Sequence, residues 1–144
     1  MKVLVIDDEP AVRYAITRIL ESQGFEVTTA PDGMRGMSQF RACPPDLVIT
    51  DLIMPEQEGM QTIKQMREVD ATVKILAISG GGRIVNVDFL QVARRLGADE
   101  ILAKPFDSRK LLSIVRRLLP SSGEAASVPL DRPSATSVQW PSAK

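Results

Sequence analysis

The chain has 144 residues, which is enough for one domain of ordinary size with a hydrophobic core. Its 18 basic and 18 acidic residues leave no net charge, so no overall basic field favours direct binding to nucleic acid. The absence of histidine excludes histidine-dependent nucleophiles and histidine metal ligands, and a single cysteine, Cys43, excludes an intrachain disulfide. No stretch approaches the ~20 apolar residues of a membrane span, and we expect a cytoplasmic protein.

Apolar runs alternate with helical spacings along the chain and predict five strands and five helices in turn. The first strand is a continuous apolar run at residues 3–6, and Pro10 suits the first turn of the helix that follows. Gly24 fits the cap at the end of that helix. The strands are expected at residues 3–6, 25–30, 46–51, 73–78 and 100–103. The helices are expected at residues 11–23, 34–42, 60–69, about 86–96 and 108–119.

This alternation indicates an α/β fold, a doubly wound parallel sheet with helices on both faces and right-handed crossovers. We expect residues 1–119 to form this domain. Residues 120–144 differ in kind, because they are rich in proline and serine and contain few large apolar residues. We expect this tail to be disordered, with Trp140 as a passenger in it rather than a docking anchor.

Polar residues gather where the predicted strands end. In a doubly wound sheet the functional crevice lies beyond the carboxyl ends of the strands. In this chain those ends carry Asp7, Asp8, Asp51, Ser79 and Lys104. Taken singly, Asp51 fits a solvated loop residue or a helix cap as well as a functional group. Its place at one edge with the other four favours a functional site.

The residue types at this edge suit phosphoryl transfer. Three carboxylates that meet repel one another, and a divalent cation offsets the repulsion. Without histidine such a metal is held by oxygen, and carboxylates with water favour Mg²⁺ over Ca²⁺ or Mn²⁺. The cation, the Lys104 ammonium and the Ser79 hydroxyl would together seat a phosphoryl group. Asp51 suits the nucleophile that forms an aspartyl phosphate, while Asp7 and Asp8 suit the metal.

Four stretches resemble the motifs of the receiver domain of two-component response regulators, the CheY-like family. They are VLVIDDEP at residues 3–10, DLVITDLIMPEQEG at 46–59, AISG at 77–80, and GAD with KPF within 97–106. The resemblance extends from residue 1 to about residue 119. It implies the flavodoxin-like strand order 2-1-3-4-5.

The resemblance also implies a phosphoacceptor and a cofactor. Asp51 would accept a phosphoryl group from a histidine kinase or a histidine phosphotransfer protein and become a 4-aspartylphosphate. Mg²⁺ would be bound by Asp8, Asp51 and the carbonyl of Ile53, with Asp7 acting largely through water.

Two further residues have implied roles, and one position departs from the family pattern. Ser79 and Lys104 would contact the phosphoryl group and report it to the rest of the fold, with a cis peptide bond between Lys104 and Pro105. The family usually has Tyr or Phe three residues before this lysine, but here the residue is Ile101. We therefore expect signalling that does not use the usual movement of an aromatic ring.

Ile53 and Gly81 occupy the positions that flank the attacking water in the family. Neither side chain has a polar group that can hold or activate this water. We therefore expect spontaneous loss of the phosphoryl group that is not fast, and a half-life of seconds would contradict this.

The expected output is a protein contact. If the chain is complete, it is a single-domain regulator, a monomer or weak homodimer, whose phosphorylated form alters binding to a partner protein. We interpret the arginines near the last helices and the fifth strand as a solvated face rather than a dimer contact; they are Arg94, Arg95, Arg109, Arg116 and Arg117.

Three other functions compete with phosphotransfer. A receiver-like scaffold that works without phosphorylation is the main alternative, and Ile101 keeps it open. A flavodoxin-like cofactor binder is disfavoured because the acidic residues 7–9 would repel an anionic cofactor. An aspartyl phosphatase usually carries a second aspartate two residues after the first, where this chain has Ile53.

Overall fold

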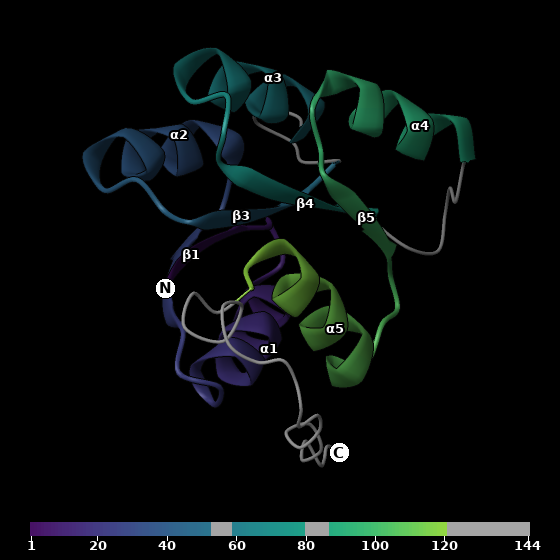
Figure 1. Cartoon of the computed structure of the whole chain (residues 1–144). Coiled ribbons are helices and arrows are strands. Elements are labelled where there is room, and N and C mark those ends of the chain that lie inside the picture. Colours follow the sequence, from purple (N-terminus) through teal and green to yellow (C-terminus); the bar gives the residue numbers. More distant parts are fainter. Residues whose placement is uncertain (53–58, 80–86, 121–144) are drawn as a thin grey trace. The chain divides into compact units, whose positions relative to one another are not determined.

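The computed structural model describes residues 1–52, 59–79 and 87–120. Its strands form one parallel sheet in the order β2-β1-β3-β4-β5 (Figure 1). The strands are β1 (Lys2–Ile6), β2 (Glu26–Ala30), β3 (Leu47–Asp51), β4 (Lys74–Ser79) and β5 (Glu100–Ala103). The helices are α1 (Pro10–Glu21), α2 (Gly33–Ala42), α3 (Gly59–Val69), α4 (Val87–Leu96) and α5 (Ser108–Leu118).

The predicted α/β fold, its ten elements and the strand order are confirmed. The largest difference for a helix lies at the end of α1, which stops at Glu21 instead of residue 23. A tight turn begins there, in which the amide of Gly24 donates to the carbonyl of Glu21 at 3.0 Å. Gly24 has a φ of +89°, a left-handed conformation that glycine adopts without strain.

The chain divides into two compact units, residues 1–105 and residues 106–144. The first unit contains the whole sheet with α1 to α4. The second contains α5, where the Asp107 side chain caps the helix by accepting a hydrogen bond from the Lys110 amide at 2.8 Å. The apolar side of α5 is buried and consists of Leu111, Leu112, Ile114, Val115 and Leu118. The tail that the sequence predicts to be disordered lies, from residue 121 on, outside the described residues.

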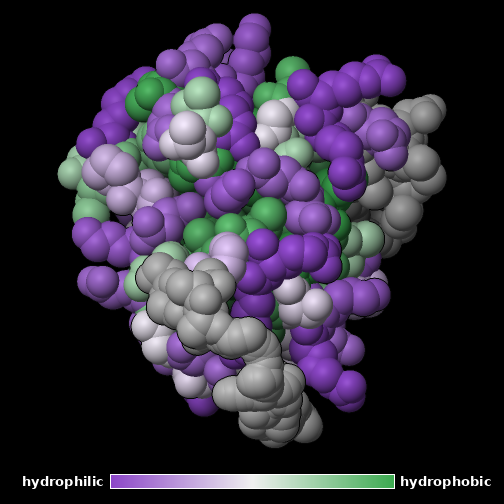
Figure 2. Space-filling view, in the orientation of Figure 1, coloured by the Kyte–Doolittle hydropathy of each residue, from purple (hydrophilic) through white to green (hydrophobic). Residues whose placement is uncertain are grey.

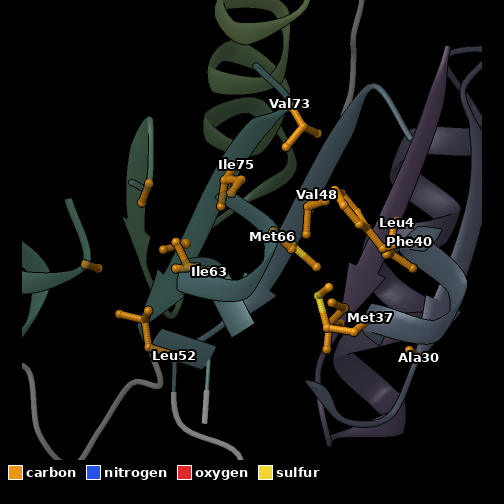
Figure 3. Close-up of a cluster of buried hydrophobic side chains, with 14 residues drawn as sticks. Leu4, Ala30, Met37, Phe40, Val48, Leu52, Ile63, Met66, Val73 and Ile75 are labelled. Carbon is orange, nitrogen blue, oxygen red and sulfur yellow. The ribbon is translucent and has the colours of Figure 1, made fainter. Parts of the chain in front are cut away.

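A hydrophobic cluster fills the space between one face of the sheet and helices α2 and α3 (Figure 3). Leu4, Val48 and Ile75 stand side by side on neighbouring strands, and Phe40 and Met66 come from the helices. Because side chains alternate along a strand, the intervening residues point to the opposite face, where α1 packs on β1 and β2. Burial on both faces explains why β1, β3 and β4 are continuous apolar runs in the sequence.

Polar side chains cover most of the face of the molecule shown in Figure 2. The large apolar side chains that are exposed come from four separate segments and are Met1, Tyr14, Met34 and Val69. Tyr14 is partly covered, because the Arg18 guanidinium lies 5.6 Å from the centre of its ring and donates to its hydroxyl at 2.9 Å.

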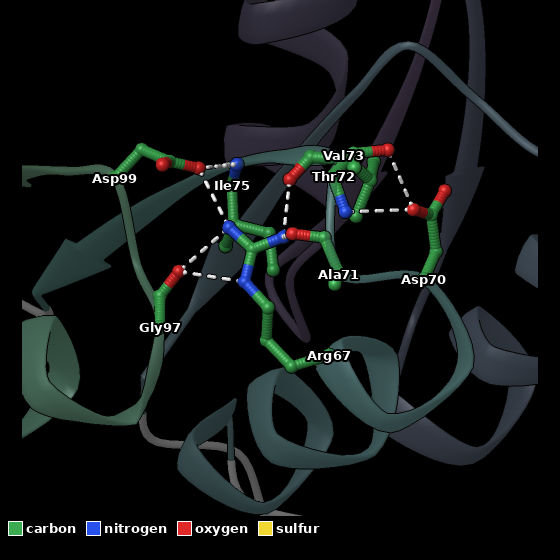
Figure 4. Close-up of polar contacts among 8 residues, drawn as sticks. All are labelled: Arg67, Asp70, Ala71, Thr72, Val73, Ile75, Gly97 and Asp99. Atoms are coloured by element: carbon green, nitrogen blue, oxygen red, sulfur yellow. Dashed lines mark hydrogen bonds and ion pairs between the residues drawn. The ribbon is translucent and has the colours of Figure 1, made fainter.

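A hydrogen-bonded cluster around Arg67 joins α3 to the amino ends of β4 and β5 (Figure 4). Its Nε and Nη2 donate to the carbonyl of Gly97 at 3.1 and 2.8 Å, and Nη2 pairs with Asp99 Oδ2 at 2.8 Å. Its Nη1 donates to the carbonyl of Val73. Asp99 Oδ2 also accepts from the amide of Ile75 at 2.8 Å. One side chain of α3 therefore connects the starting points of two strands.

Gly97 makes the close approach of Arg67 possible. Its φ of +128° is unfavourable for other residues, and a Cβ at this position would lie 2.7 Å from the Cγ of Arg67. Gly97 and Asp99 belong to one motif of the sequence, but nothing in the sequence connects them with Arg67. No periodic pattern distinguishes Arg67 from the solvated charges of α3, so the partnership is visible only in the fold.

We predict that Arg67→Ala lowers the free energy of unfolding by about 2–3 kcal/mol, because partly buried carbonyls and the Asp99 carboxylate lose their charged donor. Arg67→Lys should recover little of this loss, since an ammonium lacks the planar fork that reaches several acceptors. Urea denaturation followed by circular dichroism measures the change. The matched control is Lys64→Ala, an exposed cation on the same helix, for which we expect a change within ~0.5 kcal/mol. An equal effect of the two alanine variants would contradict the structural role of Arg67.

Candidate functional site

The register of β1 and β3 places two acidic residues at the same level of the sheet. Ile6, the last residue of β1, pairs with Thr50 of β3. The next residue along each strand is therefore Asp7 on one side and Asp51 on the other. Asp7 is held there by its amide, which donates to the carbonyl of Ala30 at the end of β2 at 3.2 Å.

The register of β4 and β5 brings the lysine to the same edge. Ser79, the last residue of β4, pairs with Ala103, the last residue of β5, and Lys104 follows directly. The backbone of Ser79 thus ends at the predicted edge, while its side chain lies outside the part of the chain that the structure describes. The peptide bond between Lys104 and Pro105 is cis, as the resemblance implied.

Three carboxylates converge at this edge. Asp7 is 1% and Asp51 4% exposed, whereas Asp8 is exposed. One carboxylate oxygen from each of the three lies within 4.8 Å of the others. Burial of carboxylates is costly unless they are paired or bind a cation. Burial is also the main reason that the pKa of Asp7 is raised, although hydrogen bonds from the Glu9 amide and Lys104 partly oppose the rise.

The Lys104 ammonium is the positive partner of these carboxylates. Its Nζ lies 3.1 Å from Asp7 Oδ2, 3.2 Å from Glu9 Oε1 and 3.4 Å from Asp51 Oδ2. Burial by itself would lower the pKa of Lys104, but the charge of Asp51 and then the contacts with Asp7 and Glu9 outweigh it and raise the pKa. The lysine therefore stays charged and offsets part of the repulsion among the acids.

Backbone contacts hold the turn between β1 and α1 that carries the acids. The amide of Glu9 donates to Asp7 Oδ1 at 2.9 Å, and Arg13 Nη1 donates to the carbonyl of Asp7 at 2.7 Å. Pro10 occupies the first turn of α1, as the sequence indicated. Glu9 belongs to the site but was not among the predicted site residues. Its place between an acidic pair and a proline at a helix start was the available signal.

Gly59 sets how closely α3 approaches the end of β3. Its amide donates to the carbonyl of Leu52 at 3.0 Å, and the amide of Leu52 donates to the carbonyl of Ile78 at 2.9 Å. A Cβ on Gly59 would overlap the carbonyl oxygen of Asp51 and lie 2.6 Å from the Cα of Leu52. The backbone beside Asp51 therefore has room for glycine alone at this position.

Three further predicted positions have different outcomes. Ile53 and Gly81 lie outside the described residues, so the expected metal contact and the expected slow loss of phosphate stay predictions. Ile101 is partly buried and packs against the hydrophobic cluster on the α2 and α3 face of the sheet. Its aliphatic side chain thus belongs to the packing of β5.

Residues 3–116 match the family "Response regulator receiver domain", and the chain belongs to this family. The protein is thus a receiver domain of two-component signalling, as the four motifs indicated. Receiver domains take part in phosphotransfer with histidine kinases or phosphotransfer proteins and act on downstream targets.

The chain is similar to characterised regulators of different length. It is 36% identical over 121 residues to the chemotaxis protein CheY of Treponema pallidum, with 82% of each chain covered. It is 33% identical over 132 residues to the transcriptional regulatory protein CseB of Streptomyces avermitilis, with 92% of this chain and 54% of that protein covered. The chain therefore spans about half the length of CseB.

A solved receiver domain has the same fold. The crystal structure of a response regulator receiver domain protein from Clostridium thermocellum superposes with a TM-score of 0.76 at 30% sequence identity. The match covers 85% of this chain and 96% of that chain. Among the described residues, none of the helices is long and apolar enough to span a membrane.

We predict that Gly59→Ala destabilises the protein by more than about 2 kcal/mol, because the new methyl group meets rigid backbone next to Asp51. The matched control is Gly36→Ala in α2, where a Cβ would meet side-chain atoms of Ile6 and no backbone atoms. Urea denaturation of both variants should give a clearly larger loss for Gly59→Ala. The reverse order would contradict a close approach of α3 to the end of β3.

Proposed function

We propose that Asp51 is the phosphoacceptor of this receiver domain. The observation that carries the proposal is the Lys104 ammonium within 3.4 Å of the buried Asp51 carboxylate, beside two further acids at the same edge. A carboxylate oxygen of Asp51 would attack phosphorus as the bond from phosphorus to the donor breaks, and the donor leaves with the bonding electron pair. Lys104 is close enough to neutralise charge on the phosphoryl oxygens.

The acidic cluster fits a Mg²⁺ site. All of its ligand atoms are carboxylate oxygens, and three such oxygens within 4.8 Å of one another suit a hard divalent cation. We assign the metal to Asp8, Asp51 and the carbonyl of Ile53, with Asp7 acting largely through water. When bound, Mg²⁺ would supply positive charge to the acceptor carboxylate and the incoming phosphoryl group.

Ser79 and Lys104 are proposed to contact the phosphoryl group from the side of β4 and β5. Their backbones lie at neighbouring strand ends: Ser79 is the last residue of β4, and Lys104 comes directly after β5. A hydroxyl that donates and an ammonium that carries charge are complementary to phosphoryl oxygens.

The phosphoryl group is proposed to come from a histidine kinase or a histidine phosphotransfer protein, and the phosphorylated form to alter binding to a partner protein in the cytoplasm. Residues 1–119 would act as the receiver, followed by the tail of residues 120–144. The presence of Asp7, Asp8, Asp51 and Lys104 in one place favours this function over a scaffold that is never phosphorylated.

We predict that incubation with Mg²⁺ and acetyl phosphate or phosphoramidate adds about 80 Da to the intact protein, the mass of a phosphoryl group that replaces a proton. Mass spectrometry of the intact chain measures the gain. Asp51→Asn should gain nothing, because an amide is not a nucleophile for this transfer. Asp46→Asn, at the opposite end of β3, should be phosphorylated like the wild type. Equal labelling of Asp51→Asn and the wild type would place the acceptor elsewhere.

We predict that Mg²⁺ stabilises the unmodified protein through the acidic cluster. At ten times its dissociation constant, a ligand of the folded state adds roughly 1.4 kcal/mol to the free energy of unfolding. That corresponds to a rise of a few degrees in Tm, measurable by thermal denaturation with and without a chelator. Asp8→Asn should lose most of this rise, whereas Glu26→Gln at the amino end of β2 should keep it. The same rise in both variants would argue against the assigned ligands.

A further inference from the structure

Glu9 lies at the entrance of the site and contacts its lysine. It is the residue before α1, and its Oε1 is 3.2 Å from Lys104 Nζ. Its side chain is 60% exposed, compared with 1% for Asp7 and 5% for Asp51. Of the three carboxylates that share the ammonium, Glu9 is thus the one on the solvent side. It can be neutralised without burying an unpaired charge.

The backbone of Glu9 is fixed on both sides. Its amide donates to Asp7 Oδ1 at 2.9 Å, and its carbonyl accepts from the amides of Val12 and Arg13, both at 3.1 Å. The side chain therefore starts from a rigid turn, and its contact with Lys104 is set by the geometry of β1 and α1 rather than by a mobile loop.

This contact has two consequences for phosphoryl transfer. An ammonium held by three carboxylates has to give up part of a contact before it can meet phosphoryl oxygens. Glu9 also adds a negative charge beside Asp7, Asp8 and Asp51, at the side from which a donor arrives. Phosphodonors are anions, so this charge opposes their approach.

We propose that Glu9 is a positioning residue that restrains the Lys104 ammonium in the unphosphorylated protein and slows phosphoryl transfer from anionic donors. The inference rests on the proposed role of Asp51 as acceptor. Glu9 acts through Lys104 and through its charge and forms no bond to the transferred group.

The proposal makes the effect of Glu9 depend on donor charge. In transfer from acetyl phosphate, a bond forms between an Asp51 oxygen and phosphorus while acetate leaves with the electron pair. In transfer from phosphoramidate, ammonia leaves instead. Acetyl phosphate carries more negative charge than phosphoramidate, whose nitrogen is protonated, so removal of the Glu9 charge should favour acetyl phosphate.

The test compares Glu9→Gln, Glu9→Asp and the matched control Glu21→Gln at the far end of α1. In Mg²⁺, we expect Glu9→Gln to raise the rate with acetyl phosphate about threefold to tenfold, the effect of one solvent-exposed charge a few ångströms away that water screens. The rate with phosphoramidate should rise by a smaller factor. Glu9→Asp keeps the charge and should keep the wild-type ratio of the two rates, and Glu21→Gln should change neither rate.

A second measurement tests whether Glu9 restrains the Lys104 ammonium, and it requires no phosphoryl transfer. In ¹⁵N-lysine-labelled protein, hydrogen exchange of the Lys104 ammonium with water should be faster in Glu9→Gln than in the wild type, and unchanged in Glu21→Gln. An unchanged exchange rate, or equal factors for the two donors, would overturn the proposal. Failure of the wild type to accept a phosphoryl group would instead refute the acceptor role of Asp51, while the exchange rate would still decide whether Glu9 restrains Lys104.

Discussion

The contact of the Lys104 ammonium with surrounding carboxylates is the interaction on which the edge of the sheet depends. Asp7 and Asp51 are buried, and two charged carboxylates at such positions would destabilise the fold if nothing positive lay between them. Lys104 reaches both, at 3.1 and 3.4 Å, and its pKa is raised because their charges outweigh the effect of its burial. The same arrangement leaves Asp8 exposed beside them, which is suited to a cation that enters from solvent.

The rest of the fold serves to bring these groups from distant parts of the chain to one place. A parallel sheet aligns the carboxyl ends of its strands, and the register places Asp7 level with Asp51. Gly59 lets α3 approach the end of β3 closely, and at the other end of the sheet Arg67 ties the starts of β4 and β5 together. Lys104 therefore follows a strand whose beginning is tied to α3.

Membership of the receiver family accounts for the acidic pair, the acceptor candidate and the lysine, but it leaves open how an individual chain adjusts their balance of charge. In this protein the Glu9 carboxylate, which extends from a rigid turn, forms an ion pair with the Lys104 ammonium. Ile101 takes part in the hydrophobic packing of β5, at a position where the family usually has an aromatic residue. Both features concern the surroundings of Lys104.

The local pattern of the chain was sufficient to predict the elements, because burial on both sheet faces produces apolar runs and each helix has its own spacing and caps. It also predicted that Asp7, Asp8, Asp51 and Lys104 share an edge, since parallel strands end on the same side. The contacts of Glu9 with Lys104 and of Arg67 with Gly97 and Asp99 could not be predicted in this way. They join residues 30 to 95 positions apart, and only the packing of helices and strands in three dimensions decides which charged side chain meets which.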